Sequence, residues 1–287
     1  MSTLLLRRRK LGRTSCREIS NLSETGIKAV RNDRAQPRHF QDVDMVIRWG
    51  CTANVPVRNV LNTAQAIHEV NDKLGFRRKL NEAELSPKTW FDVMGVPPEA
   101  RETQLVTRPS RHAQGRRLYI SNSPRSLLYS VQQAGPNYYI SELINKVAEY
   151  RVFIVQGRVA CVAKKMPRED HAPAPGEPWN VATGNFIFDN VRWDEWPLRA
   201  VRVACEAFEL SSLDFGGVDV MVDGEGKAYV LEINSAPSLT SPYRQQCMAK
   251  CFDYIVRNGK QRIPMIEERG GYRKFVHPAI TERAQLV

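Results

Sequence analysis

Short apolar runs and one long amphipathic stretch alternate along the first half of the chain. Residues 44–50 (DMVIRWG) form an apolar run that a glycine ends, and residues 57–80 carry apolar side chains at helical spacing. The first pattern predicts a strand and the second predicts a helix, which together indicate a small α/β unit. Residues 1–38 are basic, polar and weakly periodic, so we expect a mobile arm or an irregular lead-in there.

Apolar runs rich in β-branched and aromatic residues follow in the second half and predict strands. Gln156 and Gly157 separate two of these runs and predict a tight hairpin turn. A second hairpin is expected from Val218 to Ile233, around the sequence DGEG. Residues 167–178 hold four prolines and predict a long surface loop that could cover an active site. The predicted strands are 104–108, 138–144, 150–156 and 158–166, and the predicted helices are 197–213 and 241–257.

Length and composition indicate a globular protein of about two domains, because 287 residues that are 42% hydrophobic can bury a full core. No apolar run approaches the roughly 20 residues that span a bilayer, and no targeting segment is evident. We therefore expect no membrane contact and a cytoplasmic location. The six cysteines are scattered, which favours reduced thiols. Cys247 and Cys251 are spaced as on one helix face, and we expect packing there rather than a metal site.

The formal net charge of +11 is concentrated in three segments, at residues 7–13, 77–79 and 108–117. Such charge attracts polyanions, which include nucleotides, nucleic acid and phosphorylated substrates. A solvated basic surface is the plainer interpretation, and for the first segment we favour it. The charge therefore suggests anionic partners without identifying one.

The second hairpin carries three oxygen-bearing side chains among strand residues. If residues 223–226 form its loop, Asp219 lies opposite Val230, and Glu232 and Asn234 share its face. Neighbours on one face are close enough for such side chains to meet on one cation. The opposite, core-facing side would hold Val218, Val220, Val222, Leu231 and Ile233.

Two carboxylates and an amide suit Mg²⁺ or Mn²⁺ rather than zinc, and they are too few to enclose the ion. Magnesium bound by few side chains usually completes its shell with water and phosphate oxygens, so the pattern indicates a nucleoside triphosphate. A surface-facing acidic hairpin without a metal is the alternative.

Phosphate binding also needs donors, and the chain has neither a Walker A loop nor a GxGxxG turn after a strand. Arg108 and the basic, glycine-containing segment beyond it are candidates. In the first hairpin, alternation places Arg151 and Lys164 on one face, with Glu149 opposite Lys164. This face would form an anion site, although Arg151 could instead be a structural residue in a salt bridge.

These residues resemble the ATP-grasp superfamily, in particular the ribosomal-protein glutamate ligase type and related ATP-grasp proteins of tailed phages. The resemblance runs from about Asp72 to Leu239. Its strongest part is GGVDVMVDGEGKAYVLEINSAPSL, which is similar to the metal hairpin of that family. The resemblance implies that Asp219, Glu232 and Asn234 bind magnesium.

Other landmarks follow in the same order as in the family. The family usually has lysine where this chain has Arg108; arginine keeps the charge but changes the geometry. The resemblance favours Lys165 as the basic residue of the first hairpin, whereas alternation favours Lys164, and both stay candidates. For nucleotide binding it implies Lys73, Arg108, Arg111 and Gly115 of a flap, Glu142, Leu143 and Ile144 beside adenine, and Glu149 on the ribose. For catalysis it implies Arg151, Lys164 or Lys165, and Asn180, with Asn185 a weaker match.

The implied fold is α+β: an ATP-grasp fold, in which two α+β subdomains clasp ATP, preceded by a small α/β N-terminal domain. The expected segments are 1–72 for the N-terminal arm and domain, 73–140 for the small subdomain, 141–258 for the large subdomain and 259–287 for a tail. The implied activity is that of a magnesium-dependent carboxylate–amine ligase, which forms an amide through an acyl phosphate and releases ADP and phosphate.

The partners would be a carboxylate substrate and an amine acceptor: an amino acid, a peptide or a protein. An ATP-grasp kinase acting on an anionic substrate is one alternative, and a kinase would release no free phosphate. A basic nucleic-acid-binding protein is another, and its affinity would fall steeply with salt and ignore ATP. A ligase acting on a nucleic-acid-associated substrate also stays open.

Overall fold

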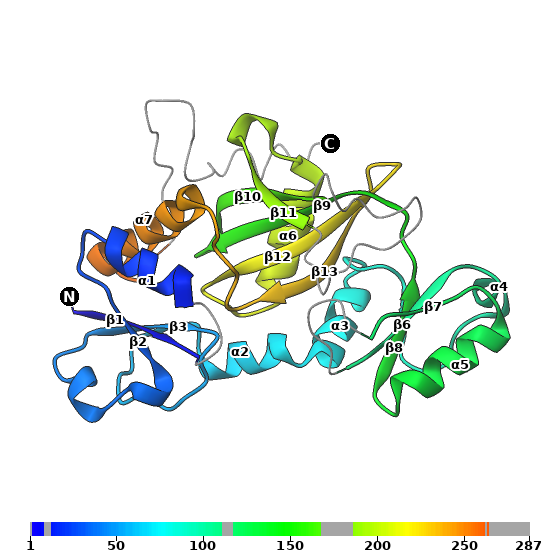
Figure 1. Cartoon of the computed structure of the whole chain (residues 1–287), viewed down its shortest axis with the longest axis horizontal. Helices are drawn as coiled ribbons and strands as arrows, with labels where there is room; N and C mark the ends of the chain where they lie inside the picture. The colour runs from blue at the N-terminus through cyan, green and yellow to red at the C-terminus, as the bar shows by residue number, and fades with distance from the viewer. Residues whose placement is uncertain (1, 9–12, 111–116, 168–185, 262, 264–287) are drawn as a thin grey trace.

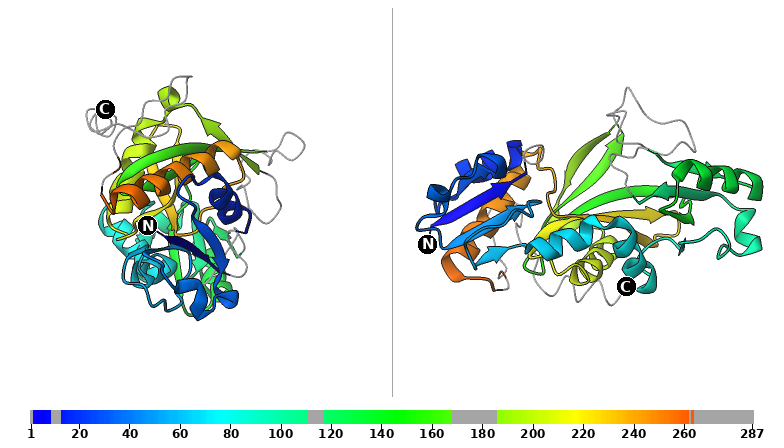
Figure 2. Two further views of the ribbon diagram at one scale, coloured as in Figure 1. Left: turned by 90° about the vertical axis from the view of Figure 1, so that its left-hand side faces the viewer. Right: turned by 90° about the horizontal axis from the view of Figure 1, so that it is seen from below.

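The computed structural model describes residues 2–8, 13–110, 117–167, 186–261 and 263. These residues form three β-sheets with helices packed around them (Figure 1). The N-terminal sheet and a small four-stranded sheet lie at opposite ends of a central five-stranded sheet, as the view from below in Figure 2 also shows. Within the described ranges, no helix combines the length and the apolar character that crossing a bilayer requires.

The N-terminal sheet is parallel and forms from residues that include those expected to be irregular. Its elements are β1 (Thr3–Arg7), α1 (Arg13–Leu22), β2 (Lys28–Arg31), the 3₁₀ helices η1 (Asn32–Arg34) and η2 (Pro37–Phe40), β3 (Met45–Trp49) and β4 (Val60–Leu61). The strand order is β2-β1-β3-β4. The prediction of an arm or irregular lead-in over residues 1–38 is therefore wrong, because β1 is an inner strand that buries Leu4, Leu5 and Leu6. A parallel strand buried on both faces shows no alternation, so periodicity did not reveal it.

The single helix expected over residues 57–80 is divided. Residues 60 and 61 belong to β4, and two helices follow, α2 (Ala64–Asn71) and α3 (Lys73–Glu82). The side chain of Asp72 accepts a hydrogen bond from Gly75 N and caps α3 at its start. Apolar spacing continues across this cap, which is why the pattern predicted one helix.

The small sheet is antiparallel and carries Arg108. Its elements are β5 (Thr89–Trp90), α4 (Pro98–Arg101), β6 (Leu105–Pro109), β7 (Tyr119–Ser121), α5 (Pro124–Ala134) and β8 (Tyr138–Glu142), in the strand order β5-β8-β6-β7. The strands predicted near residues 104–108 and 138–144 are present as β6 and β8. Strand β8 runs across the expected limit between residues 140 and 141, and the domain limits as a whole stay a prediction.

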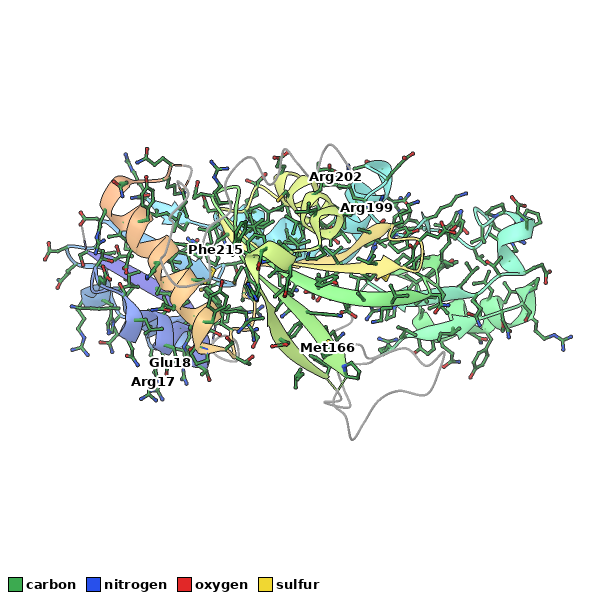
Figure 3. All side chains as sticks on the ribbon, turned by 90° about the horizontal axis from the view of Figure 1, so that it is seen from above. Arg17, Glu18, Met166, Arg199, Arg202 and Phe215 are labelled. Carbon is green, nitrogen blue, oxygen red and sulfur yellow. The ribbon has the colours of Figure 1, made fainter. Side chains whose placement is uncertain are left out.

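The central sheet is antiparallel and has a helix on each face. Its elements are β9 (Lys146–Val155), β10 (Arg158–Pro167), β11 (Phe186–Val191), η5 (Trp193–Glu195), α6 (Leu198–Glu209), β12 (Phe215–Asp223), β13 (Ala228–Asn234) and α7 (Pro242–Asn258), in the strand order β11-β10-β9-β12-β13. Figure 3 labels Arg199 and Arg202 on α6 and Phe215 at the start of β12. Helix α7 packs on the other face and buries the free thiols Cys247 and Cys251 there, as expected from their spacing.

The N-terminal sheet and the central sheet share one hydrophobic core. Trp49 at the end of β3 stacks on Phe215, with ring centroids 5.4 Å apart. Asp253 of α7 is buried and accepts hydrogen bonds from the hydroxyls of Ser23 and Thr25 and from the backbone of Glu24. These contacts fix the carboxyl ends of the parallel strands beside β12.

Candidate functional site

The hairpin of β12 and β13 contains a bulge that the sequence pattern does not reveal. Val220 pairs with Val230, but the next pair joins Asp219 to Glu232, so Leu231 is an extra residue in β13. The predicted pairing of Asp219 with Val230 is therefore wrong. The bulge brings Glu232 directly opposite Asp219 on the face away from α6.

The three candidate metal ligands nonetheless converge as predicted. Asn234 Nδ2 lies 3.3 Å from Asp219 Oδ2 and 3.2 Å from Glu232 Oε1. A half-turn of the Asn234 amide would present its oxygen at the same point, and three hard oxygen donors at one point fit Mg²⁺ or Mn²⁺. Among the described residues no group of three or more His, Cys, Asp or Glu side chains could hold a metal, so this candidate site depends on Asn234. The role of these residues as ligands stays a prediction.

Basic side chains neutralise both carboxylates. Arg151 of β9 forms a two-pronged ion pair with Asp219, with Nε–Oδ1 at 2.6 Å and Nη2–Oδ2 at 2.7 Å. Lys73, the first residue of α3, lies with Nζ 2.9 Å from Glu232 Oε2. Burial alone would raise the pKa of Glu232, but the charge and hydrogen bond of Lys73 outweigh it and lower this pKa to about 2. Burial raises the pKa of Asp219 although Arg151 opposes it.

A second ion-pair cluster lies on the same face of β9 and β10. Glu149 is buried and contacts both Lys146 and Lys165, with Lys165 Nζ 2.8 Å from its Oε1. Burial would raise the pKa of Glu149, but the two lysines outweigh it and hold this pKa below its ordinary value. The cluster places one carboxylate beside the row formed by Arg151 and Asp219.

The pairing of Glu149 decides between the two candidate lysines. The register predicted from alternation, which placed Lys164 opposite Glu149 on the face of Arg151, is wrong. The turn pairs Val155 with Arg158 as expected, but Ala160 is an extra residue in β10, and Glu149 pairs with Lys165. Lys164 pairs instead with Tyr150, which packs into the core on the α6 side.

Aromatic rings of β11 extend this face. The guanidinium of Arg151 lies 4.6 Å from the ring centroid of Phe188, and the ammonium of Lys165 lies 4.7 Å from that of Phe186. Rings in these positions hold the two cations in place without removing their charge. The sequence pattern did not indicate these partners, although the alternation in FIFDN places both phenylalanines on one face.

The remaining predicted residues are less closely grouped. Arg108 lies on β6, and its Nε is buried without a hydrogen-bond partner among the described residues, so it could still bind an anion. The backbone N–H groups of Glu142 and Leu143 donate to Lys88 O and Gln104 O at the junction that Ile144 continues. Three predicted residues, Arg111, Gly115 and Asn180, lie outside the described residues, as does nearly all of the proline-rich loop 167–178.

Comparison with known proteins gives this arrangement a family. Residues 127–253 match the model of an ATP-grasp domain, family 3 of its clade. A segment of 43 residues is 49% identical to a D-alanine–D-alanine ligase of Paraburkholderia phymatum, and this match spans 15% of the chain and 14% of that ligase.

Solved structures resemble nearly the whole chain. The D-alanine–D-alanine ligase of Bacillus anthracis has a TM-score of 0.64 at 13% identity, with 90% of this chain and 97% of that chain covered. A RiPP-associated ATP-grasp ligase of Chryseobacterium gregarium, solved with ADP and a leader and core peptide, has a TM-score of 0.60 at 13% identity, with 92% and 100% covered. The fold predicted from the hairpin motif is confirmed, and the chain is an ATP-grasp protein that matches this domain family over residues 127–253.

Proposed function

We propose that the chain is an ATP-dependent carboxylate–amine ligase that requires magnesium or manganese. The observation that carries the proposal is the convergence of Asp219, Glu232 and Asn234 beside Arg151 on one face of an ATP-grasp sheet. Hard oxygen ligands next to fixed cations suit a reaction whose demands are positioning and charge stabilisation of a transferring phosphoryl group.

In this reaction a substrate carboxylate attacks the γ-phosphorus of ATP, the bond to the β-phosphate oxygen breaks, and ADP leaves. An amine then attacks the acyl phosphate, loses a proton, and releases inorganic phosphate to form the amide. Magnesium held by the three side chains would neutralise phosphate oxygens. Arg151 and Lys165, held by Asp219, Glu149 and the rings of β11, would stabilise negative charge on the reacting groups.

The relatives suggest the class of substrate. The ligase of Chryseobacterium gregarium was solved with a leader and core peptide, and other matches are D-alanine–D-alanine ligases. We therefore propose an amino acid or a peptide as the source of the carboxylate, the amine or both.

Product analysis tests the proposal. The full chain is incubated with ATP, Mg²⁺, and pooled amino acids and peptides, and products are identified by mass spectrometry. A ligase yields an amide with ADP and phosphate, and ¹⁸O from a labelled carboxylate appears in the phosphate. A phosphorylated product without free phosphate would instead establish a kinase, and the absence of any ATP-dependent product across these pools would count against the proposal.

A further inference from the structure

The bulge at Leu231 decides which face of β13 carries Glu232. Side chains alternate along a strand, so one extra residue reverses the face of every residue beyond it. Without the bulge, the register would place Leu231 opposite Asp219 and Glu232 opposite Val218. Val218 is fully buried in the core beneath α6, so Glu232 would point into that core and not toward Asp219.

Arg77 holds the backbone of this bulge from outside the sheet. Its Nη1 donates to Val230 O at 3.2 Å, and its Nη2 donates to Leu231 O at 2.5 Å. Strand β13 lies at the edge of the central sheet, so carbonyl groups on its outer side have no strand partner. Arg77 supplies donors to both carbonyls, and it is only 6% exposed.

Helix α3 contacts the same strand through a second basic residue. Lys73 lies one turn before Arg77, and its ion pair with the Glu232 carboxylate comes from the same helix. The guanidinium of Arg77 also lies 5.3 Å from the ring centroid of Tyr139 in β8. One helix therefore contacts the side chain of Glu232, the bulge before it, and the small sheet.

We propose that Arg77 is a positioning residue for the candidate metal site, which stabilises the bulge that turns Glu232 toward Asp219 and Asn234. The proposal rests on the metal site of the proposed function but not on the identity of the ligase substrates. Residues that orient metal ligands through hydrogen bonds change metal affinity by about 10- to 100-fold when they are replaced. Loss of Arg77 should have an effect in this range.

The test measures metal binding directly. The full chain with ADP is titrated with Mn²⁺, and free Mn²⁺ is followed by electron paramagnetic resonance. Arg77→Met keeps the aliphatic length and removes the donors, and Arg77→Lys keeps the charge but can reach both carbonyls less well. Arg78→Met is the matched control, because Arg78 is exposed on the same helix and stacks on Phe91 at 4.0 Å.

We expect the Mn²⁺ dissociation constant to rise about 10- to 100-fold in Arg77→Met, less in Arg77→Lys, and less than about twofold in Arg78→Met. Amide hydrogen exchange over residues 229–234 should be faster in Arg77→Met only. Parental Mn²⁺ affinity in a folded Arg77→Met, or equal losses in the Arg77 and Arg78 variants, would overturn the proposal.

If Arg77→Met does not fold, Arg77→Lys decides: weakened Mn²⁺ binding supports the proposal, and parental binding overturns it. A parent protein that binds no Mn²⁺ with ADP would overturn the metal site itself. That outcome is separate from a failure to find ligase products, because the titration requires neither the carboxylate nor the amine.

Discussion

Glutamine at position 149 would remove the carboxylate that neutralises Lys165. The two side chains are 8% and 6% exposed, with Lys165 Nζ 2.8 Å from Glu149 Oε1. Removing one partner of a buried ion pair costs about 3–5 kcal/mol, because the other charge stays buried. Lys146 is more exposed and can turn toward water, and the Phe186 ring still faces the Lys165 ammonium. We therefore expect Glu149→Gln to lower the free energy of unfolding by about 3 kcal/mol at pH 7.

The difference should depend on pH in one direction. The pKa of Glu149 in the folded protein lies below its ordinary value of 4.5, since Lys146 and Lys165 outweigh burial. A carboxylate with a lowered pKa in the folded state contributes its full stabilisation above its ordinary pKa and loses it as the pH falls toward the folded-state pKa. The parent and Glu149→Gln should therefore converge in stability below pH 4.5.

Urea denaturation followed by tryptophan fluorescence, repeated from pH 7 downward, measures both effects. Glu225→Gln is the matched control, because it makes the same charge change at an exposed position in the turn of the second hairpin. Equal stability of the parent and Glu149→Gln at pH 7 would refute the reasoning, as would a difference that stays constant through acid pH.

Three further variants test other parts of the structure. Asp253→Asn should lower the free energy of unfolding by about 2–3 kcal/mol in urea denaturation, because the amide cannot accept all the hydrogen bonds from residues 23–25; parental stability would contradict this. Lys165→Met should reduce ATP turnover at least about tenfold more than Lys164→Met, since only Lys165 shares the face of Glu149; the reverse order would exclude the assignment. Arg108→Ala should raise the KM for ATP about tenfold in steady-state assays, with partial recovery in Arg108→Lys, and an unchanged KM would remove Arg108 from the nucleotide site.

The sequence was most informative where chemistry and local pattern coincide. Asp219, Glu232 and Asn234 stand out because polar oxygens are unusual among strand residues, and their convergence needed only a hairpin. The registers were mispredicted because alternation assumes that no residue is extra. The bulges at Leu231 and Ala160 each shift the pairing by one, and the second decides between Lys164 and Lys165.

Tertiary contacts explain the other differences. Strand β1 is a short apolar run next to four basic residues, and only its pairing with β2 and β3 makes it an inner strand. Arg77 belongs to a basic segment that sequence alone presents as surface charge, yet it is buried against carbonyls more than 150 positions away. Such contacts join distant segments, so no local pattern reveals them.

The central claim is that Asp219, Glu232 and Asn234 bind the cation that accompanies ATP. The most direct measurement is ATP turnover and Mn²⁺ binding in Glu232→Gln, with Glu225→Gln as the control for loss of one negative charge. The account predicts that Glu232→Gln loses Mn²⁺ binding and at least about a hundredfold in turnover, whereas Glu225→Gln keeps both. Parental turnover and Mn²⁺ affinity in Glu232→Gln would contradict it.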